Sequence, residues 1–280
     1  MVRLIGGLVG LTFTAALVVG AVLPREATPE DKYAKYYKHP HDISFQQDGP
    51  LGFGVLGTFD RGQLQRGFQV YKEVCSACHS LHRVAFRDLA GIGFSEPEIK
   101  ALAKNWTSEV PAIDEKTGEP TTRKATPADK IPGPYPNEVA ARAANNNALP
   151  PDLSLITKAR HDGVNYVHGL LVGYKETPPK GWETPEGLYF NEHFPNLNIA
   201  MPPPIAADDQ VTYADGTKAT VDQMSTDVAA FLQWTAEPKL ETRRRTGLAA
   251  MIFLTILTAF SYLTYRKVWA DQKGGKAVGA

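Results

Sequence analysis

One stretch of the sequence decides the fold: DRGQLQRGFQVYKEVCSACH, from Asp60 to His79. Asp60 is suited to cap a helix, and Gln63 follows it three residues later in a variant of the capping box. Apolar side chains then recur at helical spacing on one face, at Leu64, Phe68, Tyr71 and Val74. The stretch therefore predicts an amphipathic helix whose C-terminal end carries both cysteines of the chain.

The two cysteines belong to the motif CSACH, in which His79 follows Cys78 directly. A Cys-x-x-Cys pair can be a redox dithiol, half of a zinc site or a haem attachment site. A redox dithiol usually sits at the start of a helix, and a zinc site needs two further ligands, whereas no second cysteine pair exists. The motif therefore favours covalent haem c, with thioether bonds from Cys75 and Cys78 and with His79 as proximal iron ligand.

The candidates for the second axial ligand are His82, His161, His168, His193, Met201 and Met224. His82 is too near His79 to reach the opposite haem face, and Met224 falls on the apolar face of a predicted helix. Met201 lies in NIAMPPPI, where Pro202 to Pro204 hold the chain extended. A stiff loop suits a weak ligand because little entropy is left to lose. We predict Met201 as the ligand, with the filling of a hydrophobic gap as the alternative role.

The two ends of the chain differ from its middle. Gly247 to Tyr265 carries no charged side chain and spans roughly the 30 Å of a bilayer core at about 1.5 Å per residue, which predicts a transmembrane helix. The apolar run from Leu4 to Leu23 predicts an export signal, either cleaved after Ala21 or kept as a second anchor. We expect an export signal or anchor at 1–24, a head at 25–242, a membrane anchor at 243–270 and a tail at 271–280.

The export signal places the head outside the cytoplasm and the tail inside it. Positive charges flank the C-terminal apolar run on both sides, so the positive-inside rule gives no clear orientation of its own. The chain has 30 basic and 30 acidic residues, and it lacks the basic excess that is typical of nucleic-acid binders.

A second helix is predicted over TVDQMSTDVAAFLQW, with Thr220 as its cap. Its apolar stripe consists of Met224, Val228, Phe231, Leu232 and Trp234. Between the two helices the chain is rich in Pro, Gly and Asn, which predicts long loops with short helices near 153–161 and 163–172. No strand pattern persists beyond a few residues.

Several segments in order along the chain resemble the cytochrome c1 family, the haem c subunits of cytochrome bc1 complexes. They include FDRGQLQRGFQVYKEVCSACHSL, ANNNALPPDLSLITKARHDG, YVHGLLVGY, YFNEHFPNLNIAMPPPI and DVAAFLQWTAEPKLETRRRTGL. The resemblance implies a mainly α, class I cytochrome c-like head with long loops and a C-terminal transmembrane helix. It also implies a bacterial inner-membrane protein with its head in the periplasm.

The resemblance implies one covalent haem c, with Cys75, Cys78, His79 and Met201 in the roles given above. It places Arg160 beside a haem propionate, and it makes the haem pocket include Asn145, Pro151 and Tyr166. The implied role is to pass single electrons as a subunit of quinol–cytochrome c oxidoreductase, without catalysis by this chain alone. The implied partners are cytochrome b, the Rieske iron-sulfur protein, a soluble or membrane-tethered cytochrome c and membrane lipid, with no nucleic acid.

Two other functions remain open at this point. The chain could be a free-standing, membrane-tethered cytochrome that serves a terminal oxidase, since that role needs the same haem, ligands and anchor. It could also be a thiol-disulfide oxidoreductase, which would have titratable free thiols and no haem.

Overall fold

The computed structural model describes residues 2–22, 46–47 and 56–274 of the chain. The chain divides into two units, Met1–Tyr36 and Tyr37–Ala280. In the first unit, α1 (Val2–Val22) is a continuous apolar helix of 21 residues, about 30 Å long. The predicted boundary between export signal and head, at 24–25, lies outside the described residues, as does the end of the tail.

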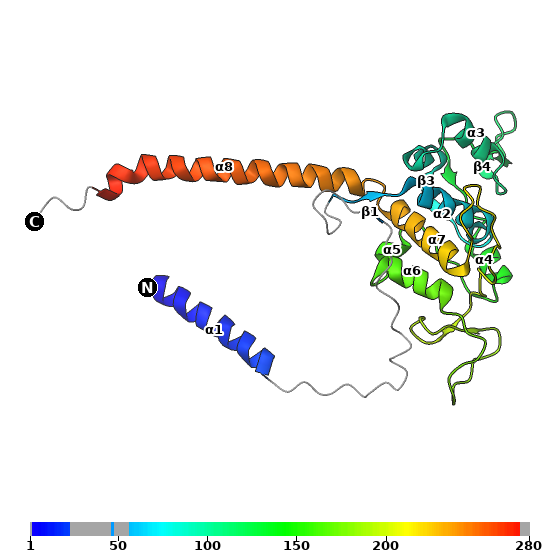
Figure 1. The fold of residues 1–280 in the computed structure, drawn as a ribbon, viewed down its shortest axis with the longest axis horizontal. Coiled ribbons are helices and arrows are strands. Elements are labelled where there is room, and N and C mark those ends of the chain that lie inside the picture. The colour runs from blue at the N-terminus through cyan, green and yellow to red at the C-terminus, as the bar shows by residue number, and fades with distance from the viewer. Residues whose placement is uncertain (1, 23–45, 48–55, 275–280) are drawn as a thin grey trace, which may run out of the picture. The chain divides into compact units, whose positions relative to one another are not determined.

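The second unit contains the head and the C-terminal helix (Figure 1). Its α-helices are α2 (Arg61–Glu73), α3 (Glu96–Lys104), α4 (Glu138–Ala144), α5 (Ile156–Ala159), α6 (Gly163–Val172), α7 (Val221–Ala236) and α8 (Leu240–Gly274). Two 3-10 helices, η2 (Cys75–Ala77) and η3 (Phe86–Ile92), lie between α2 and α3. The mainly α fold with long connections is confirmed.

Among the described residues, the strands pair as short two-stranded antiparallel ribbons. The pairs are β1 (Gln46–Gln47) with β2 (Thr58–Phe59), β3 (Leu81–Ala85) with β6 (Lys130–Ile131), β4 (Val110–Ile113) with β5 (Pro120–Arg123), and β7 (Tyr189–Phe190) with β8 (Asn198–Ile199). The expectation that no strand persists beyond a few residues is confirmed within the described parts of the chain.

Both predicted helix starts are capped as the sequence indicates. The Asp60 carboxylate accepts hydrogen bonds from the backbone N–H groups of Gly62 (2.8 Å) and Gln63 (3.2 Å). The Thr220 hydroxyl accepts one from the N–H of Gln223 at 3.1 Å. These side chains satisfy N–H groups that the first turn of a helix leaves without partners.

Helices α2 and α7 pack directly against each other and form the centre of the head (Figure 1). Gly67 on α2 lies at the crossing, where a Cβ atom would stand 2.0 Å from the carbonyl oxygen of Asp227. The Asp227 carboxylate is fully buried and accepts two hydrogen bonds from Arg66, at 2.9 and 3.3 Å. An ion pair of this kind offsets the cost of burying a carboxylate at a helix crossing.

Aromatic side chains fill much of the core around α2 and α7. They are Phe68, Tyr71, Phe86, Phe94, Trp106, Phe231 and Trp234, which contact one another edge-on, tilted or stacked at ring separations of 5.4–6.5 Å. The predicted apolar stripe of α7 is buried in this core, including Met224, which is 0% exposed.

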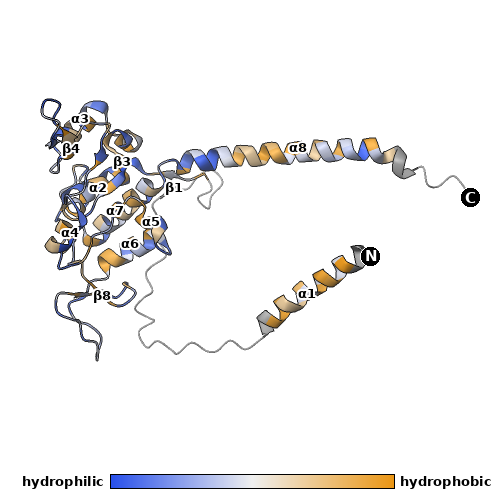
Figure 2. Ribbon diagram, turned by 180° about the vertical axis from the view of Figure 1, so that it is seen from behind, coloured by the Kyte–Doolittle hydropathy of each residue, from blue (hydrophilic) through white to orange (hydrophobic). Residues whose placement is uncertain are grey.

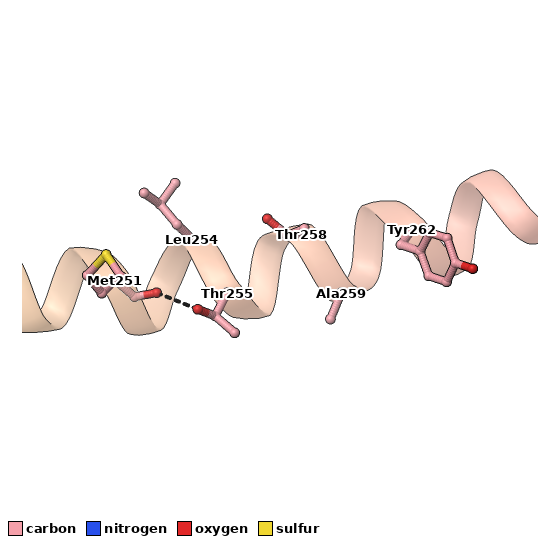
Figure 3. A pocket seen from close by; sticks show the side chains of 6 residues that line it. All are labelled: Met251, Leu254, Thr255, Thr258, Ala259 and Tyr262. Carbon is pink, nitrogen blue, oxygen red and sulfur yellow. Dashed lines mark hydrogen bonds between the residues drawn. The ribbon is translucent and has the colours of Figure 1, made fainter. Parts of the chain in front are cut away.

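Helix α8 is long and apolar enough to cross a membrane over Leu240–Ala270, and none of its most apolar window is buried in the protein. Its first turns are hydrophilic and the stretch beyond them is mostly hydrophobic (Figure 2). A shallow hollow runs along one face, lined by Met251, Leu254, Thr255, Thr258, Ala259 and Tyr262 (Figure 3). The Thr255 hydroxyl donates to the carbonyl of Met251 at 2.8 Å, which satisfies this polar group within the helix itself.

The start of α8 is tied to the start of α2. The Glu241 carboxylate accepts a hydrogen bond from the N–H of Phe59 (2.7 Å) and pairs with Arg61 (2.9 Å). One turn earlier, Glu237 pairs with Lys158 of α5 at 2.5 Å and with Arg243 of α8. The Glu241 contacts join the predicted anchor to the helix that precedes the cysteine motif, and the Glu237 pairs join it to α5.

Candidate haem-binding site

The cysteine motif continues α2 as a tighter helical turn. Helix α2 ends at Glu73, and η2 begins at Cys75. The N–H groups of Cys78 and His79 both donate to the carbonyl oxygen of Cys75, at 3.1 and 2.9 Å. Both cysteines are free, with Cys75 half-buried and Cys78 exposed. The two thiols thus lie one turn apart at the C-terminal end of a helix, as the sequence predicts.

The surroundings of Cys75 argue against a redox dithiol. Burial, with a smaller effect of the neighbouring Cys78, raises the pKa of the Cys75 thiol to about 12. Thiol-disulfide exchange needs a thiolate, so redox-active cysteines have lowered pKa values. In the parts of the chain that the structure describes, no group of three or more His, Cys, Asp or Glu side chains is placed so that it could hold a metal ion.

His79 is held at its ring and at its backbone. The Nδ1 of His79 lies 2.8 Å from the carbonyl oxygen of Pro151, and the Tyr71 hydroxyl donates to the His79 carbonyl at 3.1 Å. A carbonyl oxygen only accepts, so Nδ1 carries the proton and Nε2 keeps its lone pair. Burial lowers the pKa of His79, although the contacts with Pro151 and Asp152 act in the opposite direction. The imidazole is thus a neutral ring with Nε2 available as a ligand atom.

A loop far along the chain fixes the position of the motif. The Asp152 carboxylate accepts from the Ser80 hydroxyl (2.9 Å) and from the His82 N–H (2.7 Å). The N–H of Leu153 donates to the carbonyl of Ser80 at 3.0 Å. Because Asp152 is the neighbour of Pro151, these bonds bring the Pro151 carbonyl to the His79 ring. Asp152 is a site residue that the sequence analysis missed, and its signal is the acidic residue inside ALPPDLS.

A second link joins Asn145 to the motif. The Asn145 side chain donates to the hydroxyl of Tyr135 at 3.0 Å and to the carbonyl of Ala141 at 2.7 Å. The Tyr135 hydroxyl in turn lies 3.9 Å from the sulfur of Cys78. The structure therefore brings together Asn145, Pro151 and the motif. Tyr135 was missed because it lies in a Pro-rich and Gly-rich stretch that reads only as a loop.

The remaining predicted residues lie apart from these contacts. Tyr166 is buried on α6, and Met201 is half-buried just after β8. Arg160 is exposed, and its guanidinium donates to the neighbouring carbonyl of Ala159 at 3.2 Å. None of the contacts between described residues joins Arg160 or Met201 to His79, so their roles stay predictions.

The other candidate ligands have different surroundings. Met224 is fully buried in the core, and the ring of His168 is buried with its Nε2 2.8 Å from the Asp222 carboxylate. His82 and His161 are exposed. His193 is half-buried, with Nε2 3.8 Å from a carboxylate oxygen of Glu192.

Most of the chain matches known proteins. The profile of the Cytochrome C1 family matches residues 52–272. Cytochrome c1 of Rhodospirillum rubrum is 48% identical over 235 residues, which cover 79% of this chain and 85% of that protein. The mitochondrial cytochrome c1 heme protein of Kluyveromyces lactis is 46% identical over 245 residues, covering 88% and 81% of the two chains. Cytochrome b/c1 of Bradyrhizobium diazoefficiens is 46% identical over 240 residues, covering 78% of this chain and 34% of that longer protein. This chain belongs to the cytochrome c1 family.

Proposed function

We propose that this chain is the membrane-anchored haem c subunit of a bacterial cytochrome bc1 complex. In this role it accepts single electrons from the Rieske iron-sulfur protein and passes them to a c-type cytochrome. The observation that carries the proposal is the CSACH motif at the end of α2, with the His79 ring held through Nδ1 so that Nε2 is the unprotonated nitrogen. Membership of the cytochrome c1 family supports the same role.

The residues at the motif fit a covalent haem. Two free thiols one turn apart match the spacing of the vinyl groups, and a neutral imidazole follows directly. The haem supplies a one-electron couple at its iron. Cys75 and Cys78 would hold it, His79 and Met201 would ligate its iron, and Arg160 would pair with a propionate. The pocket wall includes Asn145, Pro151 and Tyr166.

The protein residues then set the potential and the access to the haem. The carbonyl of Pro151 fixes the orientation and tautomer of the His79 ring, which raises its basicity as a ligand. Tyr135 and Asn145 hold the loop after β6 against Cys78. With His79 and Met201 both as ligands, the iron would keep no site for a substrate, and the chemistry that the haem would supply is one-electron transfer.

The expected membrane arrangement follows from the two apolar segments. The export signal or second anchor is 1–24, the periplasmic head 25–242, the inner-membrane anchor 243–270 and the cytoplasmic tail 271–280. The name of the Bradyrhizobium relative joins cytochromes b and c1 in one protein, which supports cytochrome b as a partner here. Membrane lipid surrounds the anchor.

The test is to purify the chain from its host membranes in mild detergent and record a reduced-minus-oxidised absorption spectrum together with the iron-sulfur signals. Haem b bands and a Rieske signal that accompany the haem c band are the expected result. Haem c alone, in a detergent that leaves other complexes intact, would instead indicate a free-standing carrier. Absence of covalent haem on a denaturing gel would overturn the proposal.

Replacing Arg160 with glutamine is expected to lower the reduction potential modestly. A positive charge near a propionate favours the reduced haem, and an exposed pair worth roughly 0.2–1 kcal/mol corresponds to about 10–40 mV for a one-electron couple. Redox titration measures the shift. Arg87→Gln is the matched control, because Arg87 is also exposed and lies on η3. Equal potentials in both variants would contradict the propionate role.

A further inference from the structure

The backbone of Met201 is held by a tyrosine from a different part of the chain. The Tyr174 hydroxyl donates to the carbonyl oxygen of Met201 at 3.0 Å. Tyr174 lies two residues after the end of α6, and its side chain is half-buried. Met201 therefore has a hydrogen bond from a distant side chain at its own peptide unit.

Tyr174 itself is built into a rigid frame. Its backbone forms a β-bridge with Asn191, and the N–H of Glu192 donates to the carbonyl of Gly173 at 2.9 Å. The fully buried side chain of Asn191 donates to the carbonyl of Leu170, near the end of α6, at 2.7 Å. The packing is so close that a Cβ atom at Gly173 would lie 2.7 Å from the Asn191 amide oxygen. These contacts fix the backbone position from which the Tyr174 side chain extends.

The same frame leads directly to Met201. Strands β7 and β8 pair next to Asn191, whose N–H donates to the carbonyl of Leu197 at 3.0 Å. Strand β8 ends at Ile199, two residues before Met201. Tyr174 thus holds the chain that follows it at two points. Its backbone pairs with Asn191, and its side-chain hydroxyl reaches Met201, the residue expected to present its thioether.

The chain beyond Met201 is held independently. The Gln210 side chain donates to the carbonyl of Pro204 at 2.8 Å and accepts from the N–H of Ala206 at 2.9 Å. These two bonds hold the exit of the proline segment but leave the peptide unit of Met201 itself without support. Among the described residues, the side chain of Tyr174 is the one that bonds to that unit.

We propose that Tyr174 is a positioning residue, which fixes the backbone of Met201 so that its thioether is presented to the haem iron. The inference rests on the proposed function, in which Met201 is the sixth ligand. A thioether is a weak ligand, so its bond to iron competes with the freedom that the loop gains when the ligand leaves. A hydrogen bond at the ligand's own carbonyl reduces that freedom in advance and strengthens ligation without touching the iron.

The test is to titrate the oxidised, haem-loaded complex of the Tyr174→Phe variant with imidazole, which competes with the methionine for the iron. Phenylalanine keeps the ring and its packing and removes only the hydroxyl. We expect an apparent imidazole affinity about three- to tenfold higher than in the wild type, the change that loss of one hydrogen bond produces. The far-red charge-transfer band of methionine-ligated ferric haem should weaken in parallel.

Tyr189→Phe is the matched control, since this residue lies in the same hairpin and its side chain is 42% exposed. Wild-type imidazole affinity in both variants would overturn the role of Tyr174. A lowered unfolding temperature with unchanged imidazole affinity would overturn it too, because it indicates a structural role only. If the wild-type protein itself lacks the charge-transfer band, Met201 is not the ligand and the proposed function fails at that point instead.

Discussion

Replacing Met201 with leucine is expected to lower the reduction potential by roughly 0.2 V, a fraction of the range of about 0.8 V that axial ligands cover. Leucine fills a similar volume but has no donor atom, so the stabilisation that a thioether gives to the reduced state is lost. The vacant position should also bind carbon monoxide in the reduced protein. Redox titration and the absorption spectrum under carbon monoxide measure the two effects.

The chain offers a control with the same chemical change. Met224 lies on α7 and is 0% exposed in the core, so Met224→Leu should leave the potential unchanged and alter the free energy of unfolding by less than about 1.5 kcal/mol. An unchanged potential and no carbon monoxide binding in Met201→Leu would show that another residue completes the coordination. His193, half-buried and near Met201 in the sequence, would then be the first residue to replace.

Local patterns in the sequence were sufficient to predict the two main helices. Asp60 and Thr220 cap the helices that they were expected to cap, and the apolar positions of α7 are buried. Such features depend on neighbours within one or two turns, which a single sequence displays. The motif at the end of α2 was predictable for the same reason.

Contacts between distant loops were not predictable in this way. Asp152 holds Ser80 and His82 through bonds across about 70 residues of chain, and Tyr135 reaches Cys78 across 57. Nothing local distinguishes these side chains from those of other loop residues, because their partners are defined only after the chain folds. The hairpin of β4 and β5 was not predicted either. Its four-residue strands show no alternation of apolar side chains, and all four residues of β5 are exposed.

At Gly67, tertiary packing reverses the effect on stability that a helical glycine is expected to have. In sequence, a glycine inside a helix is a weak point, and alanine would be expected to stabilise the helix by about 1 kcal/mol. In the structure, a Cβ atom at this position would lie 2.0 Å from the Asp227 carbonyl oxygen and 2.7 Å from the Cβ of Phe231. Both atoms belong to α7 and cannot rotate away as the end of a long side chain could.

We therefore expect Gly67→Ala to destabilise the head by more than about 3 kcal/mol, beyond the 1–3 kcal/mol of ordinary overpacking, because α2 and α7 must separate. Separation would also move the end of α2, so less haem-loaded protein should accumulate. Thermal unfolding of the full chain in detergent, followed by the circular dichroism of the haem, measures the loss.

Gly62→Ala provides the comparison on the same helix. The nearest atom to a Cβ at Gly62 is an Asp60 carboxylate oxygen at 3.3 Å, on a side chain that can shift. This variant should differ from the wild type by less than about 1 kcal/mol. If both variants unfold at the wild-type temperature, the two helices do not approach each other closely at Gly67. If both are equally destabilised, the cause is the start of α2 or its helical propensity, and the packing argument fails. A large loss of stability in Gly67→Ala, with none in Gly62→Ala, would show that the crossing of α2 and α7 leaves no room for a side chain. It would also support the idea that this crossing holds the cysteine motif in place.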